Sequence, residues 1–142
     1  MNELNIMDWH HCEEKFIRKV KPDLERIKSL RKKALQRLQR AQSTSINEDT
    51  VAFVVEDYYE VIKELLIAYL LKNGMRSTNH QCLFSYFYKT NPNYELETII
   101  IRQMSYFRNR LCYYGDDIPL NFYEKNQKKF IEIIKIIEEL LS

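Results

Sequence analysis

Apolar residues recur at intervals of three and four along most of the chain, which is the spacing of an amphipathic α-helix. This pattern predicts a first helical segment over residues 13–42, bent or restarted at Pro22. Its expected buried stripe consists of Leu24, Ile27, Leu30, Ala34 and Leu38. A second helix is predicted over residues 46–72. It is apolar around much of its circumference, so we expect it to be the central helix of the core.

Three more helices are predicted, over residues 79–88, over residues 94–114 and from Pro119 to the C-terminus. The fourth helix has an apolar stripe of Leu96, Ile100, Met104, Phe107 and Leu111, and the fifth has one of Ile131, Ile134, Ile137 and Leu140. We expect an all-α fold: an up-and-down antiparallel helical bundle of four long helices plus one short helix, forming a single domain over residues 1–142.

Start and stop residues support these boundaries. Ser45 and Glu48 have the spacing of a capping box ahead of the second helix, and Ser77 or Asn79 is placed to cap the third. Asn73-Gly74 and Gly115 are typical of helix C-termini, where a left-handed residue is needed.

The 142 residues are 45% hydrophobic and 30% charged, with only 2 Gly and 3 Pro, which disfavours a fold built on tight turns. The net charge of +2 is unevenly distributed, because residues 15–42 are strongly basic and residues 48–66 are strongly acidic. Two interpretations stay open. The basic helix forms an RNA-binding stripe that reaches a rim near the end of the fourth helix, or its charges pair with the acidic helix.

Cys12, Cys82 and Cys112 form an odd and widely spaced set, which predicts free thiols in a reducing compartment. No signal peptide opens the chain, and the longest apolar run, residues 65–71, is far shorter than the roughly 20 residues that span a bilayer. We therefore expect a cytoplasmic protein that does not enter membranes. Trp9-His10-His11-Cys12 is interpreted as a surface anchor rather than a zinc site, so no metal and no cofactor are expected.

The octapeptide Arg108-Asn109-Arg110-Leu111-Cys112-Tyr113-Tyr114-Gly115 holds the main candidate site. On the fourth helix, a polar and aromatic stripe of Arg102, Tyr106, Asn109 and Tyr113 shares one face, and Ser105, Arg108 and Cys112 flank it. Such a face suits contact with a ligand or a partner surface. Alternatively, Arg108 pairs within one chain with Glu56 or Glu60.

The octapeptide resembles the signature of the HEPN domains. In that signature an Arg-Asn pair comes first, and a His follows with four residues between it and the Arg. Here Arg108 and Asn109 match, and Tyr113 stands at the His position. Residues 56–65 and 77–83 are similar to an archaeal branch of HEPN-like proteins whose motif ends in Tyr. The resemblance implies a homodimer with this helix at its twofold interface, a role in toxin–antitoxin or defence systems, and a minimal nucleotidyltransferase partner. That partner would modify Tyr113 or Tyr114.

Metal-independent RNA cleavage needs a positioned acid/base, and a tyrosine that titrates near about 10 is a poor base at neutral pH. In an up-and-down bundle His80 would lie about 30 Å from Tyr113. The leading hypothesis is therefore binding of RNA, a nucleotide or the nucleotidyltransferase through the Arg108-Asn109 face, without efficient catalysis. The alternatives are an active ribonuclease that uses Arg108, Asn109 and Tyr113, and a structural dimerisation module.

Overall fold

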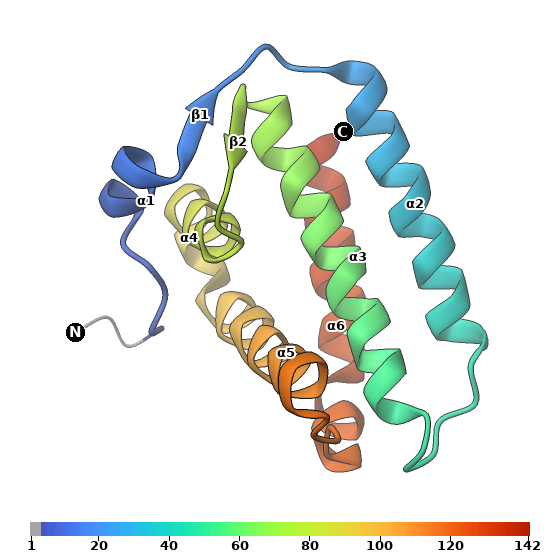
Figure 1. The fold of residues 1–142 in the computed structure, drawn as a ribbon. Coiled ribbons are helices and arrows are strands. Elements are labelled where there is room, and N and C mark those ends of the chain that lie inside the picture. Colours follow the sequence, from blue (N-terminus) through green and yellow to red (C-terminus); the bar gives the residue numbers. More distant parts are fainter. Residues whose placement is uncertain (1–3) are drawn as a thin grey trace.

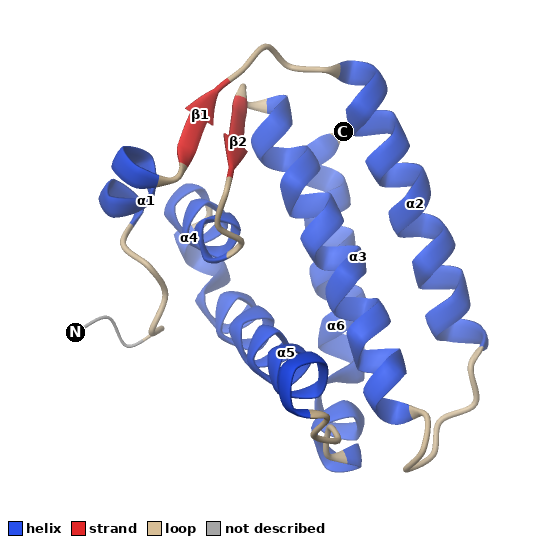
Figure 2. Cartoon of the chain, viewed as in Figure 1, coloured by secondary structure: helices blue, strands red, loops and turns tan. Residues whose placement is uncertain are grey.

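The computed structural model describes residues 4–142, and these form a mostly helical protein (Figures 1 and 2). The long helices are α2 (Leu24–Ser43), α3 (Val51–Lys72), α5 (Glu95–Tyr114) and α6 (Leu120–Leu141). The short ones are α1 (Trp9–Lys15), α4 (Gln81–Thr90) and the 3-10 turn η1 (Pro92–Tyr94). The predicted helical class is confirmed. None of the helices in the described part is long and apolar enough to cross a membrane.

Helix α3 lies at the centre of the molecule, as the sequence predicted, and packs against α2, α4, α5 and α6. Its residues Ile62, Leu65 and Leu66 are fully buried, because every side of the helix has a neighbour. A helix that is apolar around most of its surface avoids water only in such a position. Helix α3 therefore offers its few polar side chains to the neighbours on either side of it.

The N-terminal segment contains a two-stranded ribbon, so the prediction of one helix over residues 13–42, bent at Pro22, is wrong. Strand β1 (Ile17–Lys19) pairs antiparallel with β2 (Met75–Ser77), with Arg18 opposite Arg76. Three-residue strands carry no readable periodicity, and each is held by a partner distant in the chain. Helix α2 then starts after Asp23, whose carboxylate accepts a hydrogen bond from the Arg26 amide (3.0 Å).

Both predicted left-handed C-termini are confirmed, at Gly74 (φ 76°) and Gly115 (φ 69°). The predicted Ser45–Glu48 capping box is wrong, since α3 begins only at Val51. Instead the Asn47 side chain accepts hydrogen bonds from the backbone amides of Asp49 and Thr50 (2.8 and 3.0 Å). The loop between α2 and α3 forms this turn before the helix starts.

Two leucines of the predicted buried stripes are exposed: Leu24 (75%) and Leu96 (53%). Each lies in the first turn of its helix, where the apolar spacing continues beyond the packed interface. The stripes themselves are otherwise correct, with Ile27, Ala34, Ile100 and Met104 buried.

Cys12 and Cys82 form a disulfide, with a Cα–Cα separation of 5.7 Å, and Cys112 is free. The prediction of three free thiols is therefore wrong, and the cysteines no longer indicate a reducing compartment. A sequence separation of 70 residues gives no sign of proximity. The ribbon creates that proximity, because pairing of β1 with β2 brings α1 against the start of α4 (Figure 1).

Candidate functional site

The polar face of α5 is divided between two hollows. Arg102 and Tyr106 line a pocket of about 660 Å³ against α6, together with Phe107 and Phe122. Asn109 and Tyr113 instead line a separate cleft against α3 and the β2–α4 segment. The predicted stripe therefore does not form one continuous surface.

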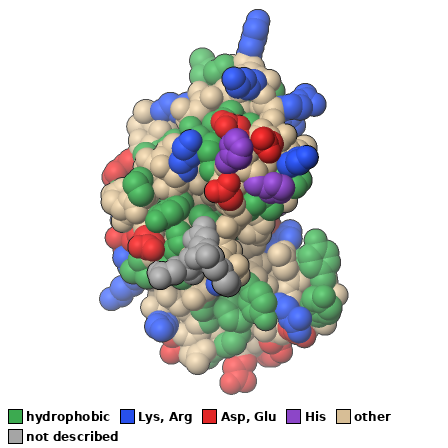
Figure 3. Space-filling view, turned by 90° about the vertical axis from the view of Figure 1, so that its left-hand side faces the viewer, with side chains coloured by type: hydrophobic (Ala, Val, Ile, Leu, Met, Phe, Trp, Pro, Cys, Tyr) green, Lys and Arg blue, Asp and Glu red, His purple; other side chains and the backbone are tan. Residues whose placement is uncertain are grey.

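We call the second hollow the His80 cleft. It has a volume of about 420 Å³ and is lined by Tyr59, Thr78, Asn79, His80, Gln81, Ser105, Arg108, Asn109 and Tyr113. The prediction that His80 lies about 30 Å from Tyr113 is wrong, because both residues line this cleft. Figure 3 views the molecule from the side of α1, α4 and α5. It shows an indentation at mid-height, on the right-hand edge of the surface.

The ribbon explains the position of His80. An up-and-down bundle would begin the next helix at the far end of α3, beyond Gly74. Here β2 runs back alongside α3, so α4 starts near the middle of that helix (Figure 1). His80 consequently lies close enough to Glu60 and Lys63 for their charges to act on it.

Local hydrogen bonds and the disulfide fix the segment that carries His80. The Thr78 amide donates to the Phe16 carbonyl (3.0 Å), which extends the pairing of the ribbon. The Asn79 side chain accepts a hydrogen bond from the Gln81 amide (2.8 Å), but the N-cap position of α4 is His80, so the prediction that Ser77 or Asn79 caps this helix is wrong. Two residues after His80, the disulfide joins Cys82 to α1. His80 therefore lies between two attachments to the N-terminal segment.

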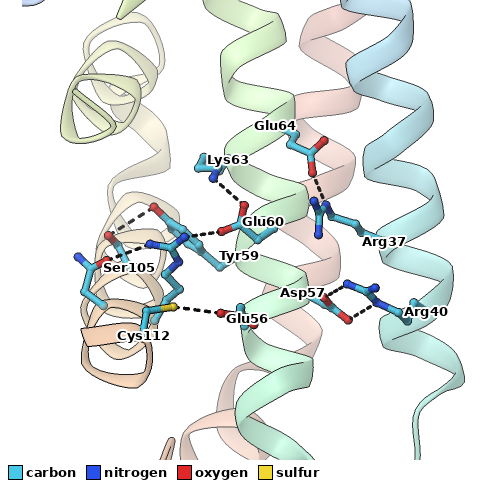
Figure 4. Close-up of polar contacts among 12 residues, drawn as sticks. Arg37, Arg40, Glu56, Asp57, Tyr59, Glu60, Lys63, Glu64, Ser105 and Cys112 are labelled. Atoms are coloured by element: carbon cyan, nitrogen blue, oxygen red, sulfur yellow. Dashed lines mark hydrogen bonds and ion pairs between the residues drawn. The ribbon is translucent and has the colours of Figure 1, made fainter. Parts of the chain in front are cut away.

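Arg108 lies on the α5 side of the cleft and pairs within one chain with Glu60, as the alternative interpretation predicted. Its Nη2 lies 3.2 Å from Glu60 Oε1, and its Nη1 donates a long hydrogen bond to Asn109 Oδ1 (3.4 Å). The contact with Glu60 lacks hydrogen-bond geometry, and Arg108 Nε is buried without a partner among residues 4–142. Glu60 also pairs with Lys63 (2.6 Å), as Figure 4 shows. Arg108 is therefore held in place but only partly satisfied.

A small hydroxyl network lies behind Arg108. Tyr59 donates to the Ser105 hydroxyl (3.4 Å; Figure 4), and the Gln81 side chain donates to the same oxygen (3.5 Å). Burial raises the pKa of Tyr59, which keeps its hydroxyl protonated and able to donate. These contacts join α3, α4 and α5 at the floor of the cleft.

The environment of the cleft sets the charges of its two main ionisable groups. Partial desolvation lowers the pKa of His80; the cations of Lys63 and Arg108 lower it further, and Glu60 opposes them. His80 is therefore mostly neutral at pH 7. Burial alone would lower the pKa of Arg108, but Glu60 and other neighbours outweigh that effect and raise it. Arg108 thus remains a cation beside a neutral imidazole.

The other predicted site residues lie at the edge of the cleft or outside it. Cys112 donates a hydrogen bond to Glu56 (3.2 Å), and burial together with that carboxylate raises the pKa of its thiol. Tyr113 is 73% exposed and Tyr114 is 69% exposed. The guanidinium of Arg110 lies 4.4 Å from the centre of the Tyr114 ring and pairs with Asp116 (2.6 Å). Arg110 therefore takes no part in the cleft.

The predicted basic rim does not reach the cleft, because α2 lies on the other side of α3 from α5 (Figure 4). There Arg37 pairs with Glu64 (2.5 Å), and Arg40 makes a bidentate pair with Asp57. These pairs are the ones expected if basic and acidic helices neutralise each other. Within residues 4–142, no group of three or more His, Cys, Asp and Glu side chains could hold a metal ion.

Sequence reasoning missed five of the cleft residues, namely Tyr59, Thr78, Asn79, His80 and Gln81. The polar run from Ser77 to Gln81 was the only visible sign of four of them, since such a run between two apolar helices marks an exposed loop, and Tyr59 had no such sign. Nothing in the order of residues showed which helix that loop faces.

Comparisons with protein-family models, with curated proteins and with solved structures found no match to this chain. The site is therefore interpreted from its own geometry.

Proposed function

We propose that this protein binds RNA or a nucleotide through a phosphate group in the His80 cleft. The observation that carries the proposal is that Arg108, His80 and several neutral hydrogen-bonding side chains line one cleft. Its volume of about 420 Å³ lies within the range of ligand sites. A cation surrounded by amide and hydroxyl groups is suited to a phosphodiester, which offers one negative charge and several acceptor oxygens.

The state of Arg108 supports this ligand. Glu60 is shared with Lys63, so it only partly neutralises the Arg108 guanidinium. The guanidinium has five donor N–H groups in a fixed plane, and the one on Nε has no partner in the described chain. An arriving phosphate would supply the missing acceptors. Arg40, by contrast, donates two hydrogen bonds to Asp57 on the other side of α3.

The family part of the proposal is a HEPN-like protein of toxin–antitoxin or defence systems, acting as a homodimer. It rests on the Arg108-Asn109 pair, which lines the cleft, and on four long helices of the kind a HEPN-like bundle would use. A minimal nucleotidyltransferase partner belongs to the same proposal, with the exposed Tyr113 and Tyr114 as acceptors. Intact mass after co-expression with such an enzyme and ATP checks this part, and an unchanged mass contradicts it.

Fluorescence anisotropy with a labelled single-stranded RNA tests binding. Arg108→Ala should weaken binding by about tenfold or more, because a charge-assisted contact is lost. The matched control is Arg110→Ala, which removes the same side chain from the same helix outside the cleft and should leave the affinity nearly unchanged. Equal effects of the two changes would contradict a specific role for the cleft and favour a structural role for Arg108.

A second candidate function is metal-independent RNA cleavage, and the position of His80 specifically favours it. A neutral imidazole can accept the proton of the ribose 2′-hydroxyl while that oxygen attacks phosphorus. The bond from phosphorus to the 5′ oxygen then breaks, and that oxygen takes up a proton, which leaves a 2′,3′-cyclic phosphate and a 5′-hydroxyl. Arg108 would stabilise the extra negative charge on the phosphoryl oxygens.

Incubation of the pure protein with RNA distinguishes cleavage from binding alone. His80→Gln should reduce the rate by about 10²–10⁴-fold and preserve RNA binding, since only the acid/base group is lost. His11→Gln, at an exposed position on α1, is the control and should cleave normally. Cleavage that persists in His80→Gln would exclude this residue as the base, and no cleavage in any variant would leave binding as the function.

A further inference from the structure

A second hollow of different character lies on the opposite side of the molecule from the His80 cleft. Helices α2 and α6 both pack on α3 and leave between them a groove of about 710 Å³, which we call the α2–α6 groove. Its apolar lining comes from all three helices: Ala34, Leu35, Leu38, Val61, Leu65 and Ile134. Its charged rim consists of Lys28, Arg31, Lys32, Lys135, Glu138 and Glu139.

The apolar side chains that reach the surface of the groove come from α2, while those of α3 and α6 are buried beneath them. Leu35 is 55% exposed, although it stands on a helix that packs against the core. A single exposed leucine is ordinary, but here Leu35 lies with the half-buried Leu38 in a groove whose floor is the buried α3 side chains. Covering these two leucines would remove apolar area from water, so the groove is suited to an apolar stripe on another molecule.

The rim has an excess of positive charge. Arg31 and Glu138 pair across the groove (2.6 Å) and offset each other. Lys28, Lys32 and Lys135 make no ion pair with any residue of the described chain, which leaves Glu139 as the one unpaired carboxylate of the rim. The α2 edge is entirely basic, so a complementary occupant has carboxylates on the edge that faces α2.

We propose that the α2–α6 groove binds an acidic amphipathic helix of a partner protein. From Lys28 to Leu38, α2 lines the groove over about 15 Å, at a rise of 1.5 Å per residue, which corresponds to about three helical turns. A helix of that length presents apolar residues at positions i, i+3, i+4 and i+7 to a groove of this kind. Leucine-like residues would lie over Leu35 and Leu38, with Glu or Asp beside Lys28 and Lys32.

This proposal does not rest on the proposed function of the His80 cleft. The two surfaces lie on different sides of α3, and the pairs of Arg37 and Arg40 with α3 separate α2 from the cleft (Figure 4). A partner helix and an RNA could therefore bind at the same time. An Arg108→Ala variant should bind the partner helix normally.

The probe is a synthetic, fluorescein-labelled 18-residue helix with leucines at i, i+3, i+4 and i+7 and glutamates at the flanking positions. Anisotropy titration should give saturable one-to-one binding. A second peptide with lysine in place of every glutamate should bind at least about tenfold more weakly, because it places like charges along the rim.

Two exposed positions test where the peptide binds. Leu35→Glu and Lys32→Glu should each weaken binding of the acidic peptide by about tenfold or more. Lys33→Glu is the matched control: the residue stands on the same helix, does not line the groove, and should change the affinity little. Circular dichroism checks that all three variants fold, which their exposed positions lead us to expect.

Several results would overturn the proposal. They are no saturable binding of the acidic peptide, equal binding of the basic peptide, and equal effects of Lys32→Glu and Lys33→Glu. Self-association in sedimentation velocity that Leu35→Glu abolishes would identify a second copy of the chain as the occupant. RNA binding that depends on Lys32 but not on Arg108 would show that the rim serves a nucleic acid instead.

Discussion

Helix α3 pairs its carboxylates with arginines on two sides, and the two sides differ in how completely they do so. Toward α2, Glu64 bonds to Arg37 and Asp57 holds Arg40 through two hydrogen bonds. Toward α5, Glu60 meets Arg108 without hydrogen-bond geometry and shares its charge with Lys63. Figure 4 shows both sides in one view.

This difference in hydrogen bonding distinguishes Arg37 and Arg40, which join two helices, from Arg108, which keeps donors available to a ligand. The α2 side has short, directional contacts between two helices that pack closely against each other, and each pair joins one helix to the other. The α5 side opens into the His80 cleft, where Arg108 stands beside a neutral imidazole. The same pairing of residue types therefore serves cohesion on one side and leaves unused donors on the other.

The largest expected effect comes from the disulfide, which lies on the cleft side and joins α1 to α4. Reduction of Cys12–Cys82 should lower the free energy of unfolding by about 4 kcal/mol, because the bond closes a loop of about 70 residues in the unfolded chain. Chemical denaturation with and without reductant measures this, and a Cys12→Ala/Cys82→Ala variant should not respond to reductant. Hydrogen exchange should rise more in α4 and β2, which lie beside the bond, than in α2; an equal rise in all three would contradict the distinction between the sides.

The next effect concerns the α2 side. Arg37→Ala should lower the free energy of unfolding by about 2 kcal/mol, because it leaves the buried carboxylate of Glu64 without its partner. The double change Arg37→Leu/Glu64→Leu should recover most of that loss, since neither charge then remains buried. Urea denaturation measures both values. A double variant no more stable than the single one would show that packing, and not the unpaired charge, causes the loss.

Arg108→Ala should cost less stability, about 1 kcal/mol or below, although it should affect RNA binding most. Glu60 keeps Lys63 as a partner when Arg108 is removed, so no carboxylate is left unpaired. The same urea titration, run beside Arg37→Ala, gives the comparison. A loss equal to that of Arg37→Ala would mean that Arg108 is a structural residue like those on the α2 side.

The smallest expected effect is a pH dependence that comes from His80. Its folded-state pKa is lower than in the unfolded chain, so the unfolded state binds more protons as the pH falls. The stability that comes from His80 is fully present above about pH 6.5, the ordinary pKa of histidine in an unfolded chain. It is lost as the pH falls from there toward the lower pKa of the folded state. The difference in unfolding free energy between wild type and His80→Gln should therefore shift between pH 7.5 and pH 5. A constant difference would contradict the lowered pKa.

The long helices could be predicted because each has a regular apolar period and a local signal at its end. The period of α3 predicts a central helix, and Gly74 and Gly115 end α3 and α5 by a left-handed conformation that glycine adopts without steric cost. The starting points were less predictable. At Asn47 a short turn competes with the helix, and the sequence spacing of Ser45 and Glu48 gives no warning of it.

The candidate site was only half predictable for the same kind of reason. Arg108, Asn109 and Tyr113 lie on one helix, so their spacing already places them together. His80 depends on β2 turning back along α3, and that depends on a strand almost sixty residues earlier.

The sequence by itself determined the helices, their apolar faces and the polar residues of α5, because these follow from contacts within a few residues. The tertiary structure alone decided the ribbon, the Cys12–Cys82 disulfide, the His80 cleft and the α2–α6 groove. Each of these joins segments far apart in the chain, and no local periodicity records which distant segments will meet. The placement of His80 beside Arg108 is accordingly a property of the fold and not of the motif.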